Sequence, residues 1–556
     1  MRYRFLLRAA LSLLVLVVAN PLVAQESRSE LHFRDVAEET GVRAALKQMH
    51  GHAAAWGDVD GDGDLDLYVG AFHKDGTRPN VLLLQQGGKF VAADQEVLKV
   101  SARSSGSIFV DFDNDGDLDF YLSNLSGGKS AHMATDNKLF RNEGSGKFTD
   151  VSADSGACPA VFRGRSVSAV DFDGDGLLDL LLGESLAYGS TKHSRLLRNL
   201  GNFRFDDITA KVGLPPLPAL GVAVGDVNND GWPDLLFVAA DGGNRLFLNE
   251  RGTRIREAVG VSKVLQSAWK YGSGDDTTSA AVIADVNRDG WLDIVLGHHF
   301  ERPWLKPVPI RLYLNQGVKD GEPTFVDVTD SCGLIPLPMK AAHVEVQDFD
   351  NDGWPEIYVS MVKFADGKPF PLIFQNQSSR GGKVAFREEM LKVNDYPNAE
   401  DRAIERTGTF FDKMIKDGKI IYTAAAPSGD FDGDGRVDLF LSSWWVEAPA
   451  LLLKNETKGG NWLDVQVRGS AENKVNRNGI GARVSAYPAG KSGAAEELLG
   501  CVEIAVGYGY SSGQQAIAHL GLGERESVDL VIQLPHGRGE IKRPSVKANQ
   551  RLVVDE

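Results

Sequence analysis

The chain has 556 residues, which is too many for one ordinary core unless the fold is built from repeats. Its 42 % hydrophobic and 24 % charged residues are normal for a globular protein, and its 61 glycines fit a fold with many tight turns. The formal net charge of −16 argues against nucleic-acid binding, which needs a basic face.

The N-terminal 1–24 segment is expected to be a secretory signal. Arg2, Arg4 and Arg8 give it a basic start, an apolar stretch follows, and Ala24 offers a small residue for cleavage. The apolar stretch of about 11 residues is too short to span a bilayer, although an uncleaved membrane anchor is the alternative. We therefore expect a secreted, periplasmic or cell-surface protein with no transmembrane segment after cleavage.

The three cysteines, Cys158, Cys332 and Cys501, lie far apart in the sequence. At most one disulfide can form, so this is not a disulfide scaffold. The sequence leaves open whether any pair forms.

One ten-residue motif, D-x-[DN]-x-D-G-x-x-[DE]-[LI], occurs seven times. Small residues precede each copy and a β-rich apolar run follows it. A second apolar strand then ends in Asn or Gln, and several repeats continue with F-x-D-[VI]-[TS]. Four short strands in a repeat of roughly 55–60 residues predict the blade of a β-propeller. The seven copies begin at Asp58, Asp111, Asp171, Asp226, Asp285, Asp348 and Asp430.

The motif has the chemistry of a calcium loop. Calcium takes six to eight oxygen ligands, and positions 1, 3, 5 and 9 offer carboxylates or amides while position 7 offers its backbone carbonyl. Gly at position 6 allows the positive φ of a sharp turn. An EF-hand would need Glu at position 12, but all seven residues there are apolar, from Val69 in the first copy to Leu441 in the last. Simple Asp/Gly-rich turns are the other alternative, but turn chemistry alone does not require an acid at position 9.

The predicted calcium ligands, up to seven ions at one per blade, follow from these positions. They are Asp58, Asp60, Asp62, Asp64 and Asp66; Asp111, Asp113, Asp115, Asp117 and Asp119; Asp171, Asp173, Asp175, Leu177 and Asp179; Asp226, Asn228, Asp230, Trp232 and Asp234; Asp285, Asn287, Asp289, Trp291 and Asp293; Asp348, Asp350, Asp352, Trp354 and Glu356; and Asp430, Asp432, Asp434, Arg436 and Asp438.

The net charge agrees with bound cations. Positions 1, 3, 5 and 9 are acidic in every copy except at Asn228 and Asn287. Four carboxylates in one loop repel one another strongly unless a cation lies between them. Most of the acidity is therefore assigned to metal sites rather than to a docking surface.

These repeats resemble FG-GAP/VCBS repeats, which build calcium-bearing propellers such as the integrin α-subunit head. The opening Trp56-Gly57-Asp58 is close to that family's pattern, and the resemblance covers roughly residues 33–455. It implies an extracellular role in adhesion or ligand binding.

The seventh repeat lacks its fourth strand, while a spare F-x-D-V segment stands near the N-terminus. That segment starts at Phe33, and Gly41 after it matches Gly156 and Gly213 in later repeats. We expect residues 33–41 to pair into the seventh blade and close the propeller, which would leave no open sheet edge. The propeller is thus assigned to residues 25–455.

Residues 456–556 resemble the ASPIC/UnbV domain, which follows FG-GAP repeats in proteins related to cartilage acidic protein. The blocks that carry this resemblance include Asn476 to Val484, His519 to Gly523 and Val528 to Gly537. The expected fold class is all-β: a seven-bladed propeller plus a small β-sandwich-like domain. Gly509-Tyr-Ser-Ser-Gly513 matches the esterase pattern G-x-S-x-G, but the strand–turn–helix that this mechanism needs is not predicted there.

A ligand is expected on the face opposite the calcium loops. Loops on a rigid scaffold often carry function, and the insertion at 389–421 would add a helical lid to this face. Aromatic side chains suit sugar rings and cations suit an anionic partner, although ordinary solvated loops are the plainer interpretation. The candidate ligand-binding residues are His50, Arg103, Arg163, Lys340, Tyr422, His298, His299, Trp304, Trp444 and Trp445.

No nucleophile or acid–base pair has diagnostic spacing, so we assign no catalytic residue. The leading hypothesis is a secreted, calcium-binding, non-enzymatic propeller whose partner is an extracellular protein or glycan. A lectin-like glycan binder, or an enzyme that acts on polysaccharides or lipids, remains the alternative. The oligomeric state and the identity of the ligand stay open.

Overall fold

The structure is a computed structural model of the chain. It describes residues 29–72, 77–126, 135–185, 193–238, 243–266, 278–299, 307–337, 339–365, 368–388, 420–444, 446 and 448–556. The predicted signal at 1–24 and most of the predicted insertion at 389–421 lie outside these residues. The α-helices in the described part are short: α1 (Val42–Ala45), α2 (Ser152–Ser155) and α3 (Val259–Val264).

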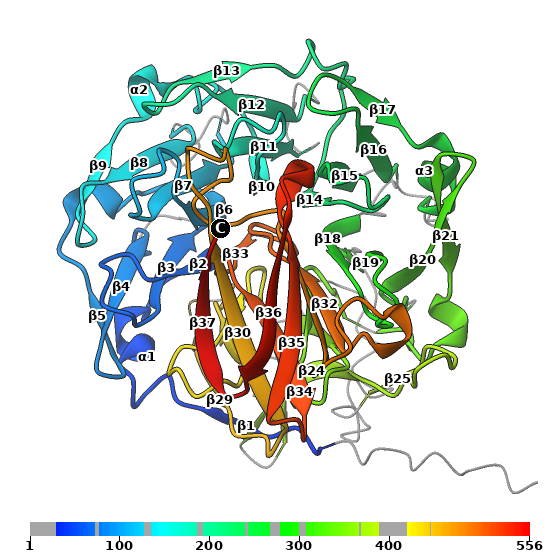
Figure 1. The fold of residues 1–556 in the computed structure, drawn as a ribbon. Helices are drawn as coiled ribbons and strands as arrows, with labels where there is room; N and C mark the ends of the chain where they lie inside the picture. Colours follow the sequence, from blue (N-terminus) through cyan, green and yellow to red (C-terminus); the bar gives the residue numbers. More distant parts are fainter. Residues whose placement is uncertain are drawn as a thin grey trace, which may run out of the picture.

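The prediction of an all-β propeller is confirmed, because seven antiparallel sheets are arranged around a central axis (Figure 1). The first four sheets contain β2 (Gly51–Gly57), β3 (Asp66–Ala71), β4 (Val81–Gln86) and β5 (Lys89–Ala92); β6 (Ser104–Val110), β7 (Asp119–Asn124), β8 (Lys138–Asn142) and β9 (Phe148–Asp150); β10 (Gly164–Val170), β11 (Asp179–Glu184), β12 (Arg195–Asn199) and β13 (Phe205–Asp207); and β14 (Gly221–Gly225), β15 (Asp234–Val238), β16 (Arg245–Asn249) and β17 (Ile255–Glu257).

The remaining three sheets continue the same pattern. They contain β18 (Thr278–Ala284), β19 (Asp293–His298), β20 (Arg311–Lys319) and β21 (Glu322–Asp327); β22 (Val344–Gln347), β23 (Glu356–Ala365), β24 (Lys368–Asn376) and β25 (Phe386–Glu388), with β26 (Ile420–Tyr422) paired to β23; and β27 (Ser428–Gly429), β28 (Asp438–Leu441), β29 (Leu451–Asn455) and β1 (Phe33–Asp35).

The first strand of each sheet lies nearest the axis (Figure 1). Space there is limited, so small residues pack best: Ala53, Ala54 and Ala55 in β2 are all fully buried. Each inner strand ends at an acidic motif, as β2 does at Asp58. All seven acidic loops therefore emerge on one face of the propeller, and the inner strands begin at the opposite face.

Strand β1 comes from the N-terminal end of the described chain but lies in the seventh sheet. Its three residues pair antiparallel with Leu453 to Asn455 of β29. The Phe33 side chain is buried and meets Phe349 edge to face at 5.8 Å. The seventh sheet in turn contacts the first, where the indole N–H of Trp56 donates to the carbonyl of Pro427 at 3.1 Å.

A set of side-chain amides, which we call the amide ring, joins each sheet to the one before it. The third strand of every propeller sheet carries an Asn, or Gln85 in the first sheet. Its side-chain N–H donates at 2.8–2.9 Å to the carbonyl of motif position 2 in the preceding sheet. The pairs are Gln85 with Phe431, Asn142 with Val59, Asn199 with Phe112, Asn249 with Phe172, Asn315 with Val227, Asn376 with Val286, and Asn455 with Phe349.

The C-terminal residues form two further sheets. One contains β34 (Ala518–Gly523), β30 (Asn461–Arg468) and β37 (Gln550–Asp555); the other contains β32 (Gly500–Glu503), β31 (Arg483–Pro488), β35 (Ser527–Gln533) and β36 (Glu540–Lys547). Buried side chains from both sheets share one core cluster with residues of the second and third propeller sheets.

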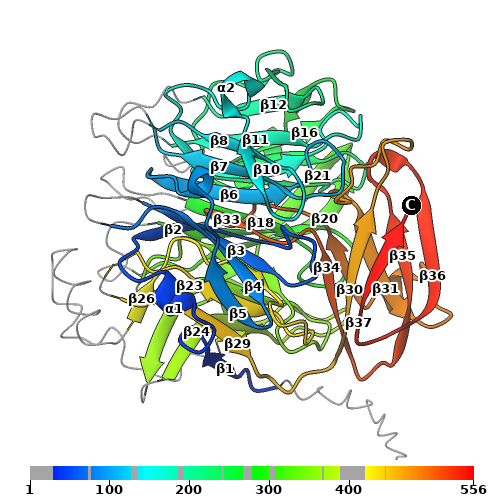
Figure 2. The same cartoon turned by 90° about the vertical axis from the view of Figure 1, so that its left-hand side faces the viewer.

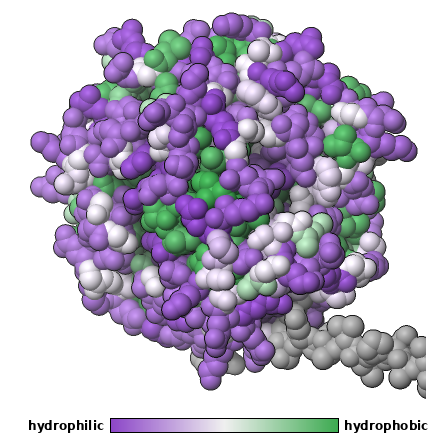
Figure 3. All heavy atoms as spheres, in the orientation of Figure 1, coloured by the Kyte–Doolittle hydropathy of each residue, from purple (hydrophilic) through white to green (hydrophobic). Residues whose placement is uncertain are grey.

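The C-terminal domain lies against the face of the propeller that carries the acidic loops (Figure 2). Viewed from that side, the molecule is mainly hydrophilic, with an apolar patch near its middle (Figure 3). Part of the acidic-loop face is therefore an interface within the chain.

One loop of the C-terminal domain enters the central channel. We call residues 507–514 the channel loop. Its strand β33 (Ser512–Gly513) pairs in parallel with Ala54 and Ala55 of β2, and so becomes a fifth strand of the first sheet. Glycine is required here, because a Cβ on Gly513 would lie 2.3 Å from the carbonyl oxygen of Ser107.

Candidate metal centres and the opposite channel mouth

The acidic loops share one hydrogen-bond pattern. The position-1 carboxylate folds the loop around itself, as Asp58 does by accepting N–H groups from Gly61 at 2.9 Å and Gly63 at 3.1 Å. Gly63, at position 6, has φ of 96°, a conformation that side chains disfavour. The glycine of the motif is thus explained by backbone geometry.

Five of the loops place three carboxylate oxygens within 4.8 Å of one another. Calcium binds oxygen at about 2.3–2.6 Å, so two ligand oxygens on opposite sides of one ion lie about 5 Å apart. The spacing of these carboxylate oxygens is therefore suitable for one calcium ion. The groups are Asp58, Asp60 and Asp62; Asp111, Asp113 and Asp115; Asp171, Asp173 and Asp179; Asp348, Asp350 and Glu356; and Asp430, Asp432 and Asp438.

The fourth and fifth loops differ, because position 3 is an amide. In these loops the N–H of Asn228 donates to Asp230 at 3.0 Å, and that of Asn287 donates to Asp289 at 2.9 Å. Among the described residues, neither of these two loops brings three acidic side chains together as the other five loops do. An amide must turn its oxygen inward to bind calcium, so we expect these two sites to be the weakest.

The position-9 acid has a structural role that its spacing did not reveal. Each of its two oxygens accepts one backbone N–H, from motif position 2 and from the amide-ring residue of the same sheet. Asp119, for example, accepts from Phe112 and from Asn142 at 2.9 Å each. A carboxylate has about four acceptor positions, so this acid holds the sheet together and still has capacity for a cation.

Burial raises the pKa of the loop carboxyls, because low-dielectric surroundings disfavour the charged form. The pKa of Asp66 rises to about 7 and that of Asp119 to about 9, and at position 1 the pKa of Asp111 rises to about 6. Neighbouring acids of the same loop raise these values further. A bound divalent cation would favour the charged forms and offset this cost.

Basic side chains stand beside two of the loops. Arg198 lies against Asp173 and Asp175 at 2.5 Å and 2.9 Å. In the seventh loop, Lys454 contacts both Asp432 and Asp434. These cations compete with a metal for the same oxygens, so we expect weaker calcium binding there than in the first, second and sixth loops. The position-7 carbonyls stay predicted ligands.

The C-terminal domain contacts the acidic loops directly. The backbone N–H of Asp111 donates to Asn478 at 2.7 Å, His536 Nε2 lies 2.9 Å from the carbonyl oxygen of Asp171, and Arg483 donates to the carbonyl of Asp226 at 2.8 Å. His519 Nε2 lies 2.8 Å from the side-chain oxygen of Asn351. Docking therefore involves loops two, three, four and six.

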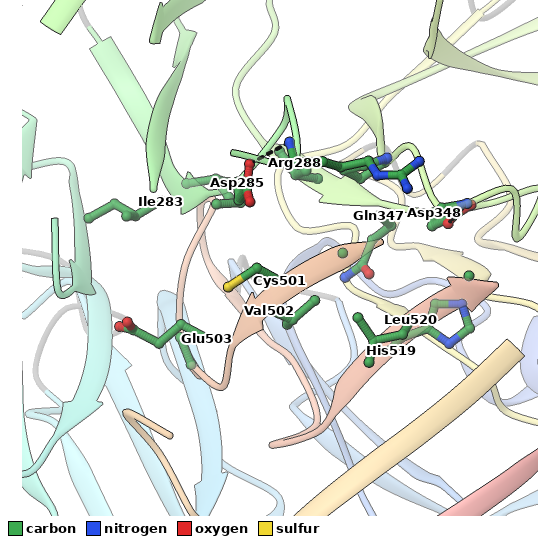
Figure 4. A pocket seen from close by; sticks show the side chains of 18 of the residues that line it. Ile283, Asp285, Arg288, Gln347, Asp348, Cys501, Val502, Glu503, His519 and Leu520 are labelled. Carbon is green, nitrogen blue, oxygen red and sulfur yellow. Dashed lines mark hydrogen bonds between the residues drawn. The ribbon is translucent and has the colours of Figure 1, made fainter. Parts of the chain in front are cut away.

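Several cavities lie between this domain and the loops. One, of about 90 Å³, is lined by Asp285, Arg288 and Asp348 on the propeller side and by Cys501 and His519 on the other (Figure 4). Another, of about 680 Å³, lies beside loops four and five, and Arg483 and Glu503 form a buried ion pair at 3.0 Å on its wall. Cys501, like Cys158 and Cys332, is a free thiol.

The esterase-like motif is buried in the channel. Ser512 Oγ lies 3.3 Å from His343 Nδ1, and His343 Nε2 lies 3.2 Å from Glu345 Oε1. All three side chains are buried, and Ser511 Oγ donates to the carbonyl of Ser105 at 2.8 Å. An esterase serine must be exposed on a strand–turn–helix elbow. The buried contacts of Ser511, Ser512 and His343 therefore hold the channel loop in place instead.

The opposite end of the channel, which we call the channel mouth, gathers most of the predicted ligand-face residues. Arg103 pairs in a backbone bridge with Phe72, Arg163 pairs with Leu125, and His298 pairs with Ala341, next to Lys340. The buried His50 ring meets Trp444 at 4.9 Å. Trp304 and Trp445 lie outside the described residues. Tyr422 is in β26, opposite Met361, and its side chain is not described.

Sequence reasoning missed two residues of the mouth, His52 and Arg165. The Arg165 guanidinium lies 3.3 Å from His52 Nε2. His52 also meets Phe72 at 4.9 Å and Trp444 at 5.2 Å. Burial, then the charges of Lys340 and Arg165, hold the pKa of His299 well below its usual value, which places these groups close together. The signal was present in the sequence, since His52 and Arg165 each follow a predicted mouth residue by two positions.

The comparisons with known proteins agree with this architecture. Residues 58–122, 127–182, 186–237 and 226–296 match the family model described as FG-GAP-like repeat, and residues 472–556 match ASPIC and UnbV. The chain is an FG-GAP-repeat protein with a C-terminal ASPIC/UnbV domain. The sixth and seventh loops lie outside the matched ranges but keep the motif and its three-carboxylate geometry.

Among curated relatives, cartilage acidic protein 1 of Mus musculus is 26 % identical, over 96 % of this chain and 78 % of its own length. Integrin alpha-7 of Homo sapiens is 30 % identical, over 24 % of this chain and 11 % of its own. Among solved structures, the exotype rhamnogalacturonan lyase YesX aligns with a TM-score of 0.37 at 13 % identity, over 72 % of this chain and 71 % of that one. That likeness is too weak to bear on function.

Within the described residues, no helix has both the length and the apolar character needed to cross a membrane.

Proposed function

We propose that this FG-GAP-repeat protein is a secreted calcium-binding propeller that mediates extracellular adhesion or ligand binding without catalysis. The main support is the repeated placement of three carboxylate oxygens within 4.8 Å in five loops. Similarity to cartilage acidic protein 1 and to integrin alpha-7 supports an extracellular setting. In this proposal calcium stabilises the scaffold, and the channel mouth presents the binding surface.

Calcium content and thermal stability test the metal part. The purified chain, after treatment with EGTA and dialysis, should rebind at least five calcium ions by elemental analysis and titration calorimetry. One site at 100 times its dissociation constant adds about 2.7 kcal/mol to the free energy of unfolding. We therefore expect EGTA to lower Tm by many degrees and added calcium to restore it.

A matched pair of variants makes the test specific. Asp58→Asn together with Asp60→Asn should remove about one ion, because two of the three clustered oxygens in the first loop lose their charge. Asp320→Asn, in the turn between β20 and β21, is the control and should change nothing. The proposal is contradicted if the chain binds no calcium, or if its Tm does not change when EGTA is added.

Secretion is tested on the full-length chain. Cleavage of the expected signal at 1–24 would give exported protein that begins at Gln25 by N-terminal sequencing. Export with an intact N-terminus would instead support the uncleaved anchor. Retention in the cytoplasm contradicts this part of the proposal.

A lectin-like glycan binder is the second candidate. It is favoured by one observation, the contact of Arg103 and Arg165 with the ring of Phe72, which in turn meets the ring of Trp444 at the channel mouth. The alternative of an enzyme acting on polysaccharides or lipids would use the same surface, and turnover of such a substrate would overturn the non-enzymatic assignment.

A further inference from the structure

The channel mouth is well separated from the acidic loops. The inner strand β2 runs from Gly51 at the mouth to Gly57 beside the first loop. A strand rises about 3.3 Å per residue, so seven residues separate the two ends by about 20 Å. That distance is roughly two Debye lengths at physiological salt, so the acidic loops do not neutralise the mouth through solvent.

A β-bulge near the start of the inner strand, found in four of the described propeller sheets, carries two of the mouth residues. In the first sheet the register passes from Gly51 opposite Ala71 to Ala53 opposite Gly70, which leaves His52 as an extra residue. In the third sheet Arg165 is extra in the same way, between Gly164 and Ser166. Such β-bulges re-aim side chains and are common beside functional sites. Both bulged residues turn toward the mouth, where they contact each other.

Cations and aromatic rings are in direct contact at this mouth. The guanidinium carbons of Arg103 and Arg165 lie 4.9 Å and 5.6 Å from the centre of the Phe72 ring. Phe72 meets Trp444 at 5.2 Å. Each cation–π contact is favourable by about 0.5–1 kcal/mol at exposed sites, and it also fixes the direction of the guanidinium. The arginines are thus held in place before any ligand arrives.

Arg165 has unused hydrogen-bonding capacity. Its Nη1 contacts His52, whose pKa is held well below its usual value by burial and then by the Arg165 charge, so His52 is neutral and does not balance that charge. Its buried Nε has no hydrogen-bond partner among the described residues. A buried donor without an acceptor costs about 1–3 kcal/mol, which a bound carboxylate would recover.

The C-terminal domain provides the floor of the mouth. Tyr510, in the channel loop, is buried and its ring lies 5.8 Å from that of His52. Its backbone N–H donates to His343 Nδ1 at 3.0 Å. The mouth therefore combines residues from propeller sheets one, two, three and seven with one from the C-terminal domain, and it is incomplete without the channel loop.

Four side chains at the mouth carry a positive charge at neutral pH: Arg103, Arg163, Arg165 and Lys340. Carboxylates in the adjoining described strands include that of Glu345, buried beside His343, and that of Glu184, which is fully buried opposite Gly164 and accepts the backbone N–H of His193 at 2.7 Å. The mouth therefore gathers basic side chains in a protein whose net charge is −16.

We propose that the channel mouth binds a saccharide that carries a carboxylate, such as a uronic acid in an extracellular polysaccharide. The planar guanidinium of Arg165, held by the buried Phe72 ring, takes the carboxylate, and the half-buried ring of Trp444 packs against the sugar face. This inference rests on the proposed ligand-binding function and names the class of its ligand. It makes the site a joint product of the propeller and the C-terminal domain.

Two tetramers that differ only at C6 test the inference. Titration calorimetry of the calcium-loaded chain with a β-1,4-linked glucuronate tetramer should give saturable binding, and the matching neutral glucose tetramer should bind at least about 10-fold more weakly. Arg165→Ala and Trp444→Ala should each weaken glucuronate binding about 10-fold or more. Arg204→Ala, an exposed arginine in the turn between β12 and β13, is the matched control and should not.

The outcomes separate the possible ligands and the two proposals. Equal binding of both tetramers overturns the carboxylate part, and displacement of the glucuronate tetramer by inorganic sulfate at equal concentration overturns the saccharide part. Absence of any glucuronate binding by a chain that binds calcium and unfolds cooperatively overturns the inference alone. Glucuronate binding by a chain that takes up no calcium instead overturns the proposed calcium function. Circular dichroism of each variant shows that it is folded.

Discussion

At the residue scale, the fold depends on a few buried polar groups that recur in every sheet. The position-9 acid accepts two backbone N–H groups, and the amide-ring residue reaches the carbonyl of the preceding sheet. Both residues recur in the sequence, and the acid was predicted there as a calcium ligand rather than as an acceptor of backbone N–H groups. The Asn or Gln was visible in each apolar strand, but its partner lies 77–106 residues away, or 346 for Gln85, so spacing gave no sign of its role.

Loss of one amide of the ring should destabilise the whole propeller. Asn199 is fully buried, donates to the carbonyls of Phe112 and Leu178, and accepts the N–H of Gly201. Asn199→Ala leaves these groups without partners, and each costs about 1–3 kcal/mol. We expect urea unfolding to show a loss of about 3 kcal/mol or more. The exposed Asn473→Ala is the control, and equal stability of the two variants would show that the ring is dispensable.

Stability should also fall in mild acid because of a buried neutral histidine. Burial lowers the pKa of His298 to about 3, and Lys340 and Arg311 contribute. Its Nε2 lies 3.2 Å from the carbonyl oxygen of Val308. The unfolded chain, with an ordinary histidine pKa near 6.5, binds the extra proton first, so the free energy of unfolding declines as pH falls from about 6.5 toward 3.

This pH dependence has a measurable size. At pH 5 the His298 contribution is on the order of 1–2 kcal/mol relative to pH 7.5. In saturating calcium, His298→Asn should lose less stability than the wild type between these two pH values, as measured by urea unfolding. An identical loss in both proteins would mean that His298 does not carry the effect.

At the element scale, the sequence predicted the strands that recur in every repeat. It did not predict local irregularities or the strand that the C-terminal domain adds. Seven motifs with their flanking apolar runs correctly located the strands around them, such as β7 and β8 around the second loop. The bulges at His52 and Arg165 were not predicted, because one extra residue does not disturb a short apolar pattern. Strand β33 was missed because Ser512 and Gly513 have no strand preference and pair only through the channel.

Strand β1 should be essential for the stability of the propeller. Phe33, Val36 and Ala37 are buried against the seventh sheet and its neighbours. Deletion of residues 26–41 exposes the edge of β29 and removes these contacts. We expect a large fall in Tm and concentration-dependent aggregation, because an unpaired edge strand invites further pairing. Deletion of residues 26–30 alone is the control, and equal Tm values for the two deletion variants would contradict the expectation.

At the scale of the whole molecule, the acidic loops are both candidate metal sites and a docking surface. Sequence reasoning treated them as scaffold and directed attention to the opposite face. It did not predict that the C-terminal domain covers them, because contacts such as that of Asp111 with Asn478 join residues more than 360 positions apart. Neither the loop residues nor the domain residues form a sequence pattern that is typical of an interface. The interface is seen only when the folded surfaces are in contact.

Docking and calcium binding should therefore be coupled at the sixth loop. Gly521 of β34 lies so close to this loop that an added Cβ would meet the Asp348 carboxylate oxygen at 1.9 Å. Gly521→Ala must displace either the domain or the carboxylate, since neither is free to overlap. We expect the variant to bind calcium more weakly at one site and to exchange backbone hydrogens faster in the channel loop. Overpacking of this kind typically costs about 1–3 kcal/mol.

Gly260→Ala is the matched control, because Gly260 lies in α3 with nothing within 4 Å of its added Cβ. Calcium titration calorimetry and hydrogen exchange by mass spectrometry measure the two effects separately. Coupling requires that both change together in Gly521→Ala, and that saturating calcium restores part of the protection of residues 507–514. If calcium affinity falls while the channel loop stays protected, the metal sites and the docked domain are independent, and the loops act on the propeller alone.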